Sequence, residues 1–196
     1  MRLSHCNRKL PLAQRSKRPH VSRVTDANPP TPELIDNFRN AMRHVAATDY
    51  AVTTQVDGDR FRILATAVSS LSFDPPSLLV CVNQTASLHD PLAQAETFGI
   101  NVLGLGNRNV AEHFQRPLPI DRFAEGDWQD WHGVPVLASA QSSLICRTAH
   151  RHEFGTHSIF VGTLEAAKHR DNATPLTYYD RHYIDISEAP EKARKL

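Results

Sequence analysis

Apolar residues recur at helical spacing near the beginning of the part of the chain that we expect to fold. The apolar positions of this segment are Leu34, Ile35, Phe38, Met42 and Val45. Their spacing places them on one stripe of a helix. Thr31 is a residue type that caps helices, and Pro32 suits the first helical position, where its missing N–H is not needed. The pattern predicts an amphipathic helix from residue 32 to about residue 47 that lies on a larger body.

Strand-like alternation follows this helix. Residues 50–56 alternate between two faces, and the sequence DGDR at residues 57–60 indicates a hairpin turn because Gly58 can adopt a positive φ. One long strand is predicted to return over residues 61–73. It ends at Asp74, Pro75 and Pro76, since proline cannot donate to a strand ladder. A short apolar strand is predicted to follow over residues 77–83.

The remaining pattern gives more strands than helices. Short helices are predicted at residues 88–97 and 107–115, and strands at residues 98–104, 142–150, 157–169 and 176–186. Residues 116–134 and 150–156 read as loops. Six to eight strands, often consecutive, favour a barrel with helical insertions over a doubly wound sheet.

Composition and charge divide the chain into a body and two ends. With 196 residues, of which 40% are hydrophobic and 22% charged, one globular domain over residues 31–187 is expected. Residues 1–30 hold seven of the 22 Lys and Arg residues but one of the 21 acidic residues, and they lack periodicity. We expect a disordered basic extension there and a flexible tail over residues 188–196. A nucleic-acid contact by the basic extension is the alternative function that this charge leaves open.

Several classes of protein do not fit the sequence. No apolar run reaches the roughly 18 residues of a membrane span, and no secretory signal is expected. The cysteines Cys6, Cys81 and Cys146 are odd in number and lack CxxC spacing, so neither a disulfide framework nor a zinc site is indicated. We expect no metal site and a cytoplasmic protein. The sequence GLGNRN from Gly104 predicts a turn, because it lacks the third glycine of a dinucleotide-binding fingerprint.

Three small hydroxyl residues, Thr66, Ser69 and Ser70, lie within the strand predicted over residues 61–73. An unpaired buried hydroxyl costs about 1–3 kcal/mol, so these side chains need partners. They either bond neighbouring backbone groups or face solvent, or they line a slot for a polar ligand. The residues by themselves leave both interpretations open.

An ordered set of short motifs spans most of the chain, roughly residues 38–183. The motifs are SFDPPSLLVCVN, TASLH, FGINVL, AEHF, GTHSIFVGTLEAA and LTYYDRHY. Together they resemble the flavin reductase domain family. Its members are FMN-binding split barrels, and they include the reductase components of two-component flavin monooxygenases. The resemblance implies a mainly β fold, a six-stranded Greek-key split barrel with flanking short helices, and a homodimer.

The same resemblance implies an NAD(P)H-dependent flavin reductase. FMN or FAD would be reduced by NADH or NADPH through hydride transfer from nicotinamide C4 to flavin N5. The reduced flavin would pass to a separate monooxygenase, with no nucleic acid or membrane involved. A non-catalytic flavin-binding protein of the same fold is the alternative.

The resemblance also implies a set of site residues. His157 would position the nicotinamide nucleotide as the catalytic residue, and Thr85, Ser87 and His89 would hold the flavin phosphate at a helix start. The full cofactor-binding set is Leu64, Ala65, Thr66, Ala67, Val68, Ser69, Ser70, Val82, Asn83, Gln84, Thr85, Ser87, His89, Phe114, His157 and Tyr183.

This chain departs from the family pattern at four positions. They are Arg62 and Arg181, where many members have glycine, Leu64, where many have threonine, and Thr156, where the pattern has aspartate. Arg62 would either neutralise a phosphate or point to solvent.

Overall fold

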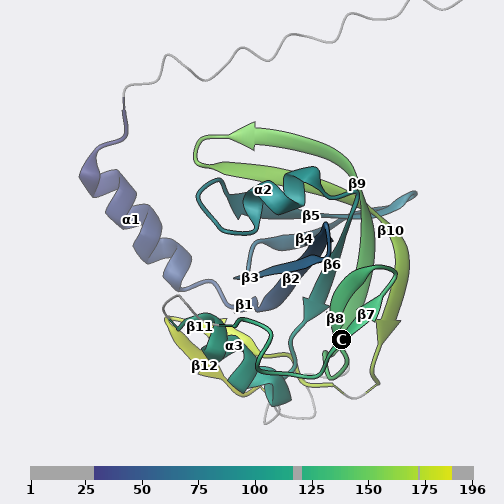
Figure 1. Cartoon of the computed structure of the whole chain (residues 1–196). Coiled ribbons are helices and arrows are strands. Elements are labelled where there is room, and N and C mark those ends of the chain that lie inside the picture. The colour runs from purple at the N-terminus through teal and green to yellow at the C-terminus, as the bar shows by residue number, and fades with distance from the viewer. Residues whose placement is uncertain (1–28, 117–120, 172, 187–196) are drawn as a thin grey trace, which may run out of the picture.

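The computed structural model describes residues 29–116, 121–171 and 173–186. Its main sheet has seven antiparallel strands in the order β3-β2-β6-β9-β10-β5-β4. These strands are β2 (Tyr50–Val56), β3 (Asp59–Ala65), β4 (Val68–Phe73), β5 (Pro76–Asn83), β6 (Thr97–Val102), β9 (Ser142–Phe154) and β10 (His157–His169). The sheet is curled, and β3 and β4, which are consecutive in the chain, form its two opposite edges (Figure 1).

Short elements surround this sheet. The small strands are β1 (Ala47–Thr48), β11 (Thr177–Tyr179) and β12 (His182–Ile184) in one sheet, and β7 (Trp128–Trp131) and β8 (Val134–Leu137) in another. The helices are α1 (Pro32–Arg43), α2 (His89–Gln94), the 3-10 turn η1 (Leu105–Asn107) and α3 (Arg108–Phe114). None of the helices in the described ranges is long and apolar enough to cross a membrane.

The predicted mainly β split barrel is confirmed, but its strand number is not six. The main sheet has seven strands because residues 61–73 form two strands rather than one. The chain turns at Thr66 and Ala67, where the Val68 amide donates to the Thr66 carbonyl over 3.0 Å and the Cys81 amide donates to the Ala67 carbonyl over 3.0 Å. Pairing with β5 therefore starts at this corner and directs β4 away from β3.

The described residues form three clusters of buried hydrophobic side chains, of which the two larger ones position the site. The first fills the inside of the curled sheet and contains Val52, Leu78, Val80, Val82, Leu88, Leu92, Phe98, Ile100, Cys146 and Phe160. Helix α2 contributes Leu92 to this core and lies beneath the β9–β10 hairpin in Figure 1. The second core lies between the sheet and α3 and contains Ala51, Leu103, Val110, Ala111, Leu137, Ala140 and Leu176. Leu64 of β3 packs against this second core.

The N-terminal helix forms as predicted but does not lie on the body. The Thr31 hydroxyl accepts from the Leu34 amide over 3.2 Å, and Pro32 is the first helical residue. The apolar stripe, however, remains exposed, with Phe38 64% and Met42 50% accessible. Helix α1 projects away from the sheet (Figure 1), and its end is fastened by an ion pair of 2.9 Å between Arg43 and Asp180.

Two predicted loops contain regular structure. Strand β9 continues to Phe154, so the predicted loop at residues 150–156 reduces to a tight turn in which Gly155 has a φ of +57°. The loop-rich segment 116–134 contains strand β7. The sequence GLGNRN forms the η1 turn and the start of α3, as expected for a turn. The predicted tail 188–196 and residues 1–28 of the predicted basic extension lie outside the described residues.

Candidate functional site

The corner between β3 and β4 carries the residues from Leu64 to Ser70. Among the described strands, β3 pairs with β2 alone and β4 pairs with β5 alone. The outer edge of each strand therefore presents backbone N–H and C=O groups that no strand of the described chain uses. Such an open edge is suited to a ligand with polar atoms on its rim.

The small hydroxyl residues of this corner are exposed. Thr66, Ser69 and Ser70 all face the surface, and the Ser69 hydroxyl donates to the Ser70 carbonyl over 3.1 Å. These side chains therefore lie at the surface rather than within a buried strand. Their hydroxyl groups are accessible to a ligand at the corner.

Separate hollows lie on the two sides of the corner. The first has a volume of about 230 Å³ and is lined by Asp49, Leu64, Ala65, Thr66, Gln115 and Tyr178. The second has a volume of about 320 Å³ and is mostly apolar, with Val68, Ser69 and Ser70 in its wall beside Tyr50 and Leu144. The structure therefore divides the predicted residues between two hollows, and Ala67 lines neither of them.

The turn after β5 lies directly beside His157. Asn83 is opposite His157 in the β5–β10 ladder, and the Gln84 amide donates to the Thr156 carbonyl over 2.9 Å. The Asn83 side-chain oxygen accepts from the Thr85 amide over 2.9 Å and from the Thr85 hydroxyl over 2.8 Å. This turn and the tip of the β9–β10 hairpin therefore form one rigid unit. It brings four predicted residues, Asn83, Gln84, Thr85 and His157, together.

His157 itself is exposed at the first position of β10. Its Nδ1 atom lies 2.9 Å from the Thr156 hydroxyl, which fixes the ring orientation. The Nε2 atom forms no hydrogen bond with the described residues. An exposed imidazole held by one nitrogen is suited to contact a ligand with the other.

The predicted site residues Val82 and His89 have buried side chains. The Val82 side chain is 1% exposed and packs in the first core. The His89 ring lies between Asp90 Oδ1 at 2.8 Å and Ser158 Oγ at 2.9 Å, so both of its nitrogens already have partners. His89 was predicted to contact the phosphate, but neither nitrogen of its ring is free to form that hydrogen bond.

A buried acid that the sequence interpretation missed stands behind the corner. Asp49 is 2% exposed, and its Oδ2 atom accepts from the Tyr183 hydroxyl over 2.8 Å. The Gln115 side chain donates to the same hydroxyl over 3.2 Å. Burial raises the pKa of the Asp49 carboxyl, and the hydrogen bond from Tyr183 partly offsets this rise. In this structure the hydroxyl group of Tyr183, which was predicted to bind the cofactor, instead donates a hydrogen bond to Asp49. No sequence pattern indicated Asp49, because it precedes a strand as a single acid.

One of the two alternatives for Arg62 was that it points to solvent. The structure shows that it does not, because its side chain is buried. It is 2% exposed and packs against three aromatic rings. Its guanidinium carbon lies 3.6 Å from the ring centre of Phe114, 4.9 Å from that of Phe123 and 4.9 Å from that of Trp128. The predicted site residue Phe114 therefore contacts Arg62 behind β3.

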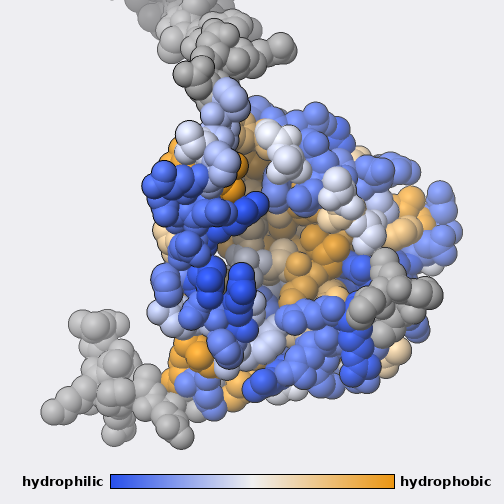
Figure 2. Space-filling model, turned by 90° about the vertical axis from the view of Figure 1, so that its left-hand side faces the viewer, coloured by the Kyte–Doolittle hydropathy of each residue, from blue (hydrophilic) through white to orange (hydrophobic). Residues whose placement is uncertain are grey.

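The surface is hollowed on the face that carries α1 (Figure 2). Figure 2 shows that the face of the molecule that carries α1 is hollowed in its middle, with hydrophobic residues in the hollow and hydrophilic residues around it. Thr66 also lines a space of about 460 Å³ between the corner and α1. The corner residue Thr66 therefore lies beside α1.

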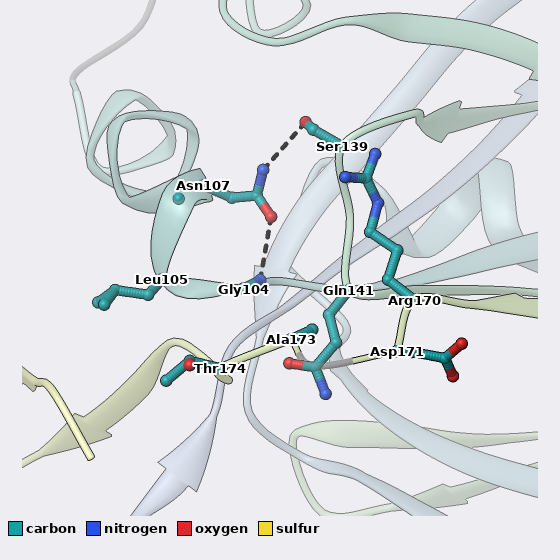
Figure 3. A pocket seen from close by; sticks show the side chains of 10 residues that line it. Gly104, Leu105, Asn107, Ser139, Gln141, Arg170, Asp171, Ala173 and Thr174 are labelled. Atoms are coloured by element: carbon teal, nitrogen blue, oxygen red, sulfur yellow. Dashed lines mark hydrogen bonds between the residues drawn. The ribbon is translucent and has the colours of Figure 1, made fainter. Parts of the chain in front are cut away.

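Another pocket, of about 450 Å³, lies near the η1 turn (Figure 3). The Asn107 side chain accepts from the Gly104 amide over 3.0 Å and donates to the Ser139 hydroxyl over 3.0 Å. Arg170 donates to the Ala138 carbonyl over 2.7 Å. These polar groups hold loops together, so the pocket has a structural explanation.

Comparison with known proteins identifies relatives of this arrangement. The model of the "Flavin reductase like domain" family matches residues 42–187. FMN reductase (NADH) RutF 1 of Methylorubrum extorquens is 39% identical over 155 residues, which are 78% of this chain and 77% of the relative. The reductase component of the FADH(2)-dependent resorcinol hydroxylase of Rhizobium sp. is 35% identical over 157 residues, 78% of this chain and 88% of the relative. The NADH:FAD oxidoreductase SgcE6 of Streptomyces globisporus superposes with a TM-score of 0.73 at 26% identity, covering 81% of this chain and 97% of that one.

Proposed function

This chain belongs to the flavin reductase like domain family, and we propose that it is an NAD(P)H-dependent flavin reductase that reduces FMN or FAD. The observation that supports this function best is the open corner between β3 and β4, beside the turn that contacts His157. The relatives are an FMN reductase that uses NADH and the reductase component of a hydroxylase.

The residues of the corner fit a flavin. Backbone groups along the open edges at residues 64–70 would hold the rim of the isoalloxazine ring, and the exposed hydroxyls of Thr66, Ser69 and Ser70 would supply further polar contacts. Asn83 and Gln84 would hold the pyrimidine side of the ring, and Thr85 and Ser87 would hold the phosphate. A bound flavin would supply the hydride acceptor.

His157 contacts the nicotinamide nucleotide in this proposal. Its ring is exposed and held by Thr156, so it orients the nucleotide without undergoing a covalent step. Val82 and His89 support the site through the backbone and through packing, because their side chains are committed to the interior.

The test is NADH and NADPH oxidation followed by nicotinamide absorbance, with riboflavin, FMN or FAD added. The His157→Asn variant should lower the maximal rate by about tenfold while leaving flavin affinity within about twofold, because it removes a positioning contact. The His169→Asn variant is the matched control, since His169 ends the same strand and is exposed. Tight flavin binding with no nicotinamide oxidation would instead identify a non-catalytic flavin-binding protein.

Two further assignments belong to this proposal. Reduced flavin leaves the protein for a separate monooxygenase in the cytoplasm, in agreement with the hydroxylase component among the relatives and with the free thiols of Cys81 and Cys146. The protein is a homodimer, in which a second copy covers the exposed apolar stripe of α1. Sedimentation of the purified protein tests this state, and Phe38→Glu should shift it toward the monomer.

A further inference from the structure

Phe154 ends strand β9 at the tip of the β9–β10 hairpin, and the proposed function does not use it. Its side chain is 65% exposed. Within the described ranges, Phe154 belongs to none of the three hydrophobic clusters, and its ring pairs with no other aromatic ring. Exposure of a single apolar residue is common and does not by itself indicate a function. The position of Phe154 in the sheet is what distinguishes it.

Phe154 lies directly opposite His157 in the β9–β10 ladder, and Gly155 and Thr156 form the turn between them. Residues that are directly opposite in an antiparallel ladder point to the same face of the sheet, with their Cβ atoms about 4.5–5.5 Å apart. The Phe154 ring and the His157 imidazole are therefore neighbours on one face of the hairpin tip. Both side chains are exposed, so a single planar ligand can contact both of them.

This pair extends a row of residues that crosses three strands. Asn83 is opposite His157 on its other side, so Asn83, His157 and Phe154 follow one another across β5, β10 and β9. Because neighbouring strands lie about 4.8 Å apart, Phe154 is one strand beyond His157 and about 10 Å from Asn83. In the proposed function Asn83 holds the flavin ring and His157 contacts the nicotinamide nucleotide. The row therefore places Phe154 on the side of the nicotinamide that is turned away from the flavin.

The hairpin tip is held in place relative to the proposed flavin site. Gly155 has a φ of +57°, which allows two residues to close the turn. The Gln84 amide donates to the Thr156 carbonyl over 2.9 Å, so the tip is bonded to the turn after β5. The Thr156 hydroxyl lies 2.9 Å from Nδ1 of His157. Phe154 and His157 are thus positioned before a ligand binds, which lowers the entropy cost of orienting that ligand.

We propose that Phe154 contacts the nicotinamide ring and covers the face of that ring that is turned away from the flavin. Hydride transfer requires one face of the nicotinamide to lie against the flavin, so the opposite face is left to the protein or to solvent. The Phe154 ring packs on this second face, while the imidazole of His157 contacts the polar edge. This inference rests on the proposed function, since it needs the flavin at the corner and the nicotinamide at His157.

An aromatic side chain is suited to this contact. Two planar rings attract each other in offset-stacked or edge-to-face arrangements, in addition to the gain from removing their surfaces from water. Phe154 has no hydrogen-bonding group in its side chain, so it favours a flat ring over a sugar or a phosphate. Covering the ring also keeps water away from the site of hydride transfer.

The experiment compares Phe154→Ala with the wild type in steady-state oxidation of NADH at saturating FMN. Phe154→Ala should raise the KM for NADH about tenfold and lower kcat by less than about threefold. Flavin affinity, measured by fluorescence titration, should remain within about twofold of the wild type. Phe154→Tyr keeps the aromatic ring, so its KM for NADH should stay within about twofold of the wild type.

Binding without turnover is measured by calorimetry, with NAD⁺ titrated into the FMN-loaded protein. Phe154→Ala should weaken this binding about tenfold. Phe73→Ala is the matched control, because Phe73 is 89% exposed and ends β4 at the opposite end of the β4–β5 hairpin from Asn83. This control should leave both the KM for NADH and the NAD⁺ affinity unchanged.

Reduced nicotinamide mononucleotide, which lacks the adenosine part of NADH, identifies the ring that Phe154 contacts. Its KM should rise in Phe154→Ala by the same factor as the KM for NADH. A rise for NADH alone would assign Phe154 to the adenine ring and overturn the inference.

Other results would overturn the inference while leaving the reductase proposal intact. They are an unchanged KM in Phe154→Ala, an equal effect of Phe73→Ala, and a weakened affinity for flavin instead of NADH. Sedimentation of Phe154→Ala that is shifted toward the monomer would assign the residue to an interface between copies, with the same consequence. A wild type that oxidises no nicotinamide nucleotide with any flavin would instead refute the proposed function itself.

Discussion

Two charged side chains, Asp49 just before β2 and Arg62 in the middle of β3, are buried, and they differ in whether they have hydrogen-bond partners. Near the corner, Asp49 accepts a hydrogen bond from Tyr183, which is held in turn by Gln115. In the middle of β3, Arg62 is enclosed by aromatic rings, and its guanidinium nitrogens have no hydrogen-bond partner in the described structure.

This difference separates a buried charge that stabilises the fold from one that destabilises it. A buried charge with hydrogen-bond partners fixes the elements that provide them, here β12 and the end of α3 around Asp49. A buried charge without partners decreases the stability of the fold. The three experiments below test this distinction, in order of expected effect.

Removal of the donor to Asp49 should have the largest effect. Tyr183→Phe should lower the free energy of unfolding by about 1–2 kcal/mol, because it leaves a buried carboxylate oxygen without its hydrogen bond. Urea denaturation measures this value. Tyr178→Phe is the control, as Tyr178 contacts the Tyr183 ring at a centroid distance of 5.5 Å. An equal loss in both variants would assign the effect to ring packing.

At Arg62 the expected sign is opposite. Arg62→Met should raise the free energy of unfolding by about 1 kcal/mol in the absence of flavin, since it keeps an apolar stem against the rings and removes an unpaired charge. Arg60→Met, at an exposed position, should change stability by less than about 0.5 kcal/mol. A large destabilisation of Arg62→Met would show that contacts with the three rings stabilise the fold more than burial of the charge destabilises it.

The smallest effect concerns the pH dependence of stability at Asp49. Burial raises the pKa of this carboxyl in the folded state above its ordinary value of 3.8, so the folded state binds the proton more strongly than the unfolded state. The wild type therefore loses stability from this group as pH rises from about 4 through the raised pKa. Relative to the wild type, Asp49→Asn should therefore become more stable as pH rises from 4 to 7. Urea denaturation at both pH values checks this, and a constant difference would contradict it.

Much of the fold could be predicted because local patterns agreed with it. Strand β2 begins and ends where the alternation of residues 50–56 placed it, and β10 has the predicted bounds. The break at Thr66 and Ala67 was not predicted, since it is caused by pairing with the distant residue Cys81 and not by any local breaker. The periodicity of residues 32–47 likewise predicted helix α1 correctly, but a local pattern does not show whether the apolar stripe of the helix is covered.

The candidate site could be predicted in part. The motif residues of the corner and of the turn after Asn83 were found, but the neighbours that assemble around them come from elsewhere in the chain. Asp49 and Gln115 become relevant through burial and contact, which a single sequence does not contain. One signal was present: glycine followed by threonine at residues 155 and 156 is compatible with a two-residue hairpin turn, which pairs Phe154 with His157.

The corner between β3 and β4 has a consequence for how the protein acquires its site. The two strands are joined by two residues, yet within the main sheet their relative position is fixed through β2, β6, β9, β10 and β5 in turn. A fragment that ends after the motif turn would contain the residues of the corner without the ladder that aligns them. We therefore expect a nascent chain to bind flavin only after residue 169 has been synthesised and β10 has joined the sheet.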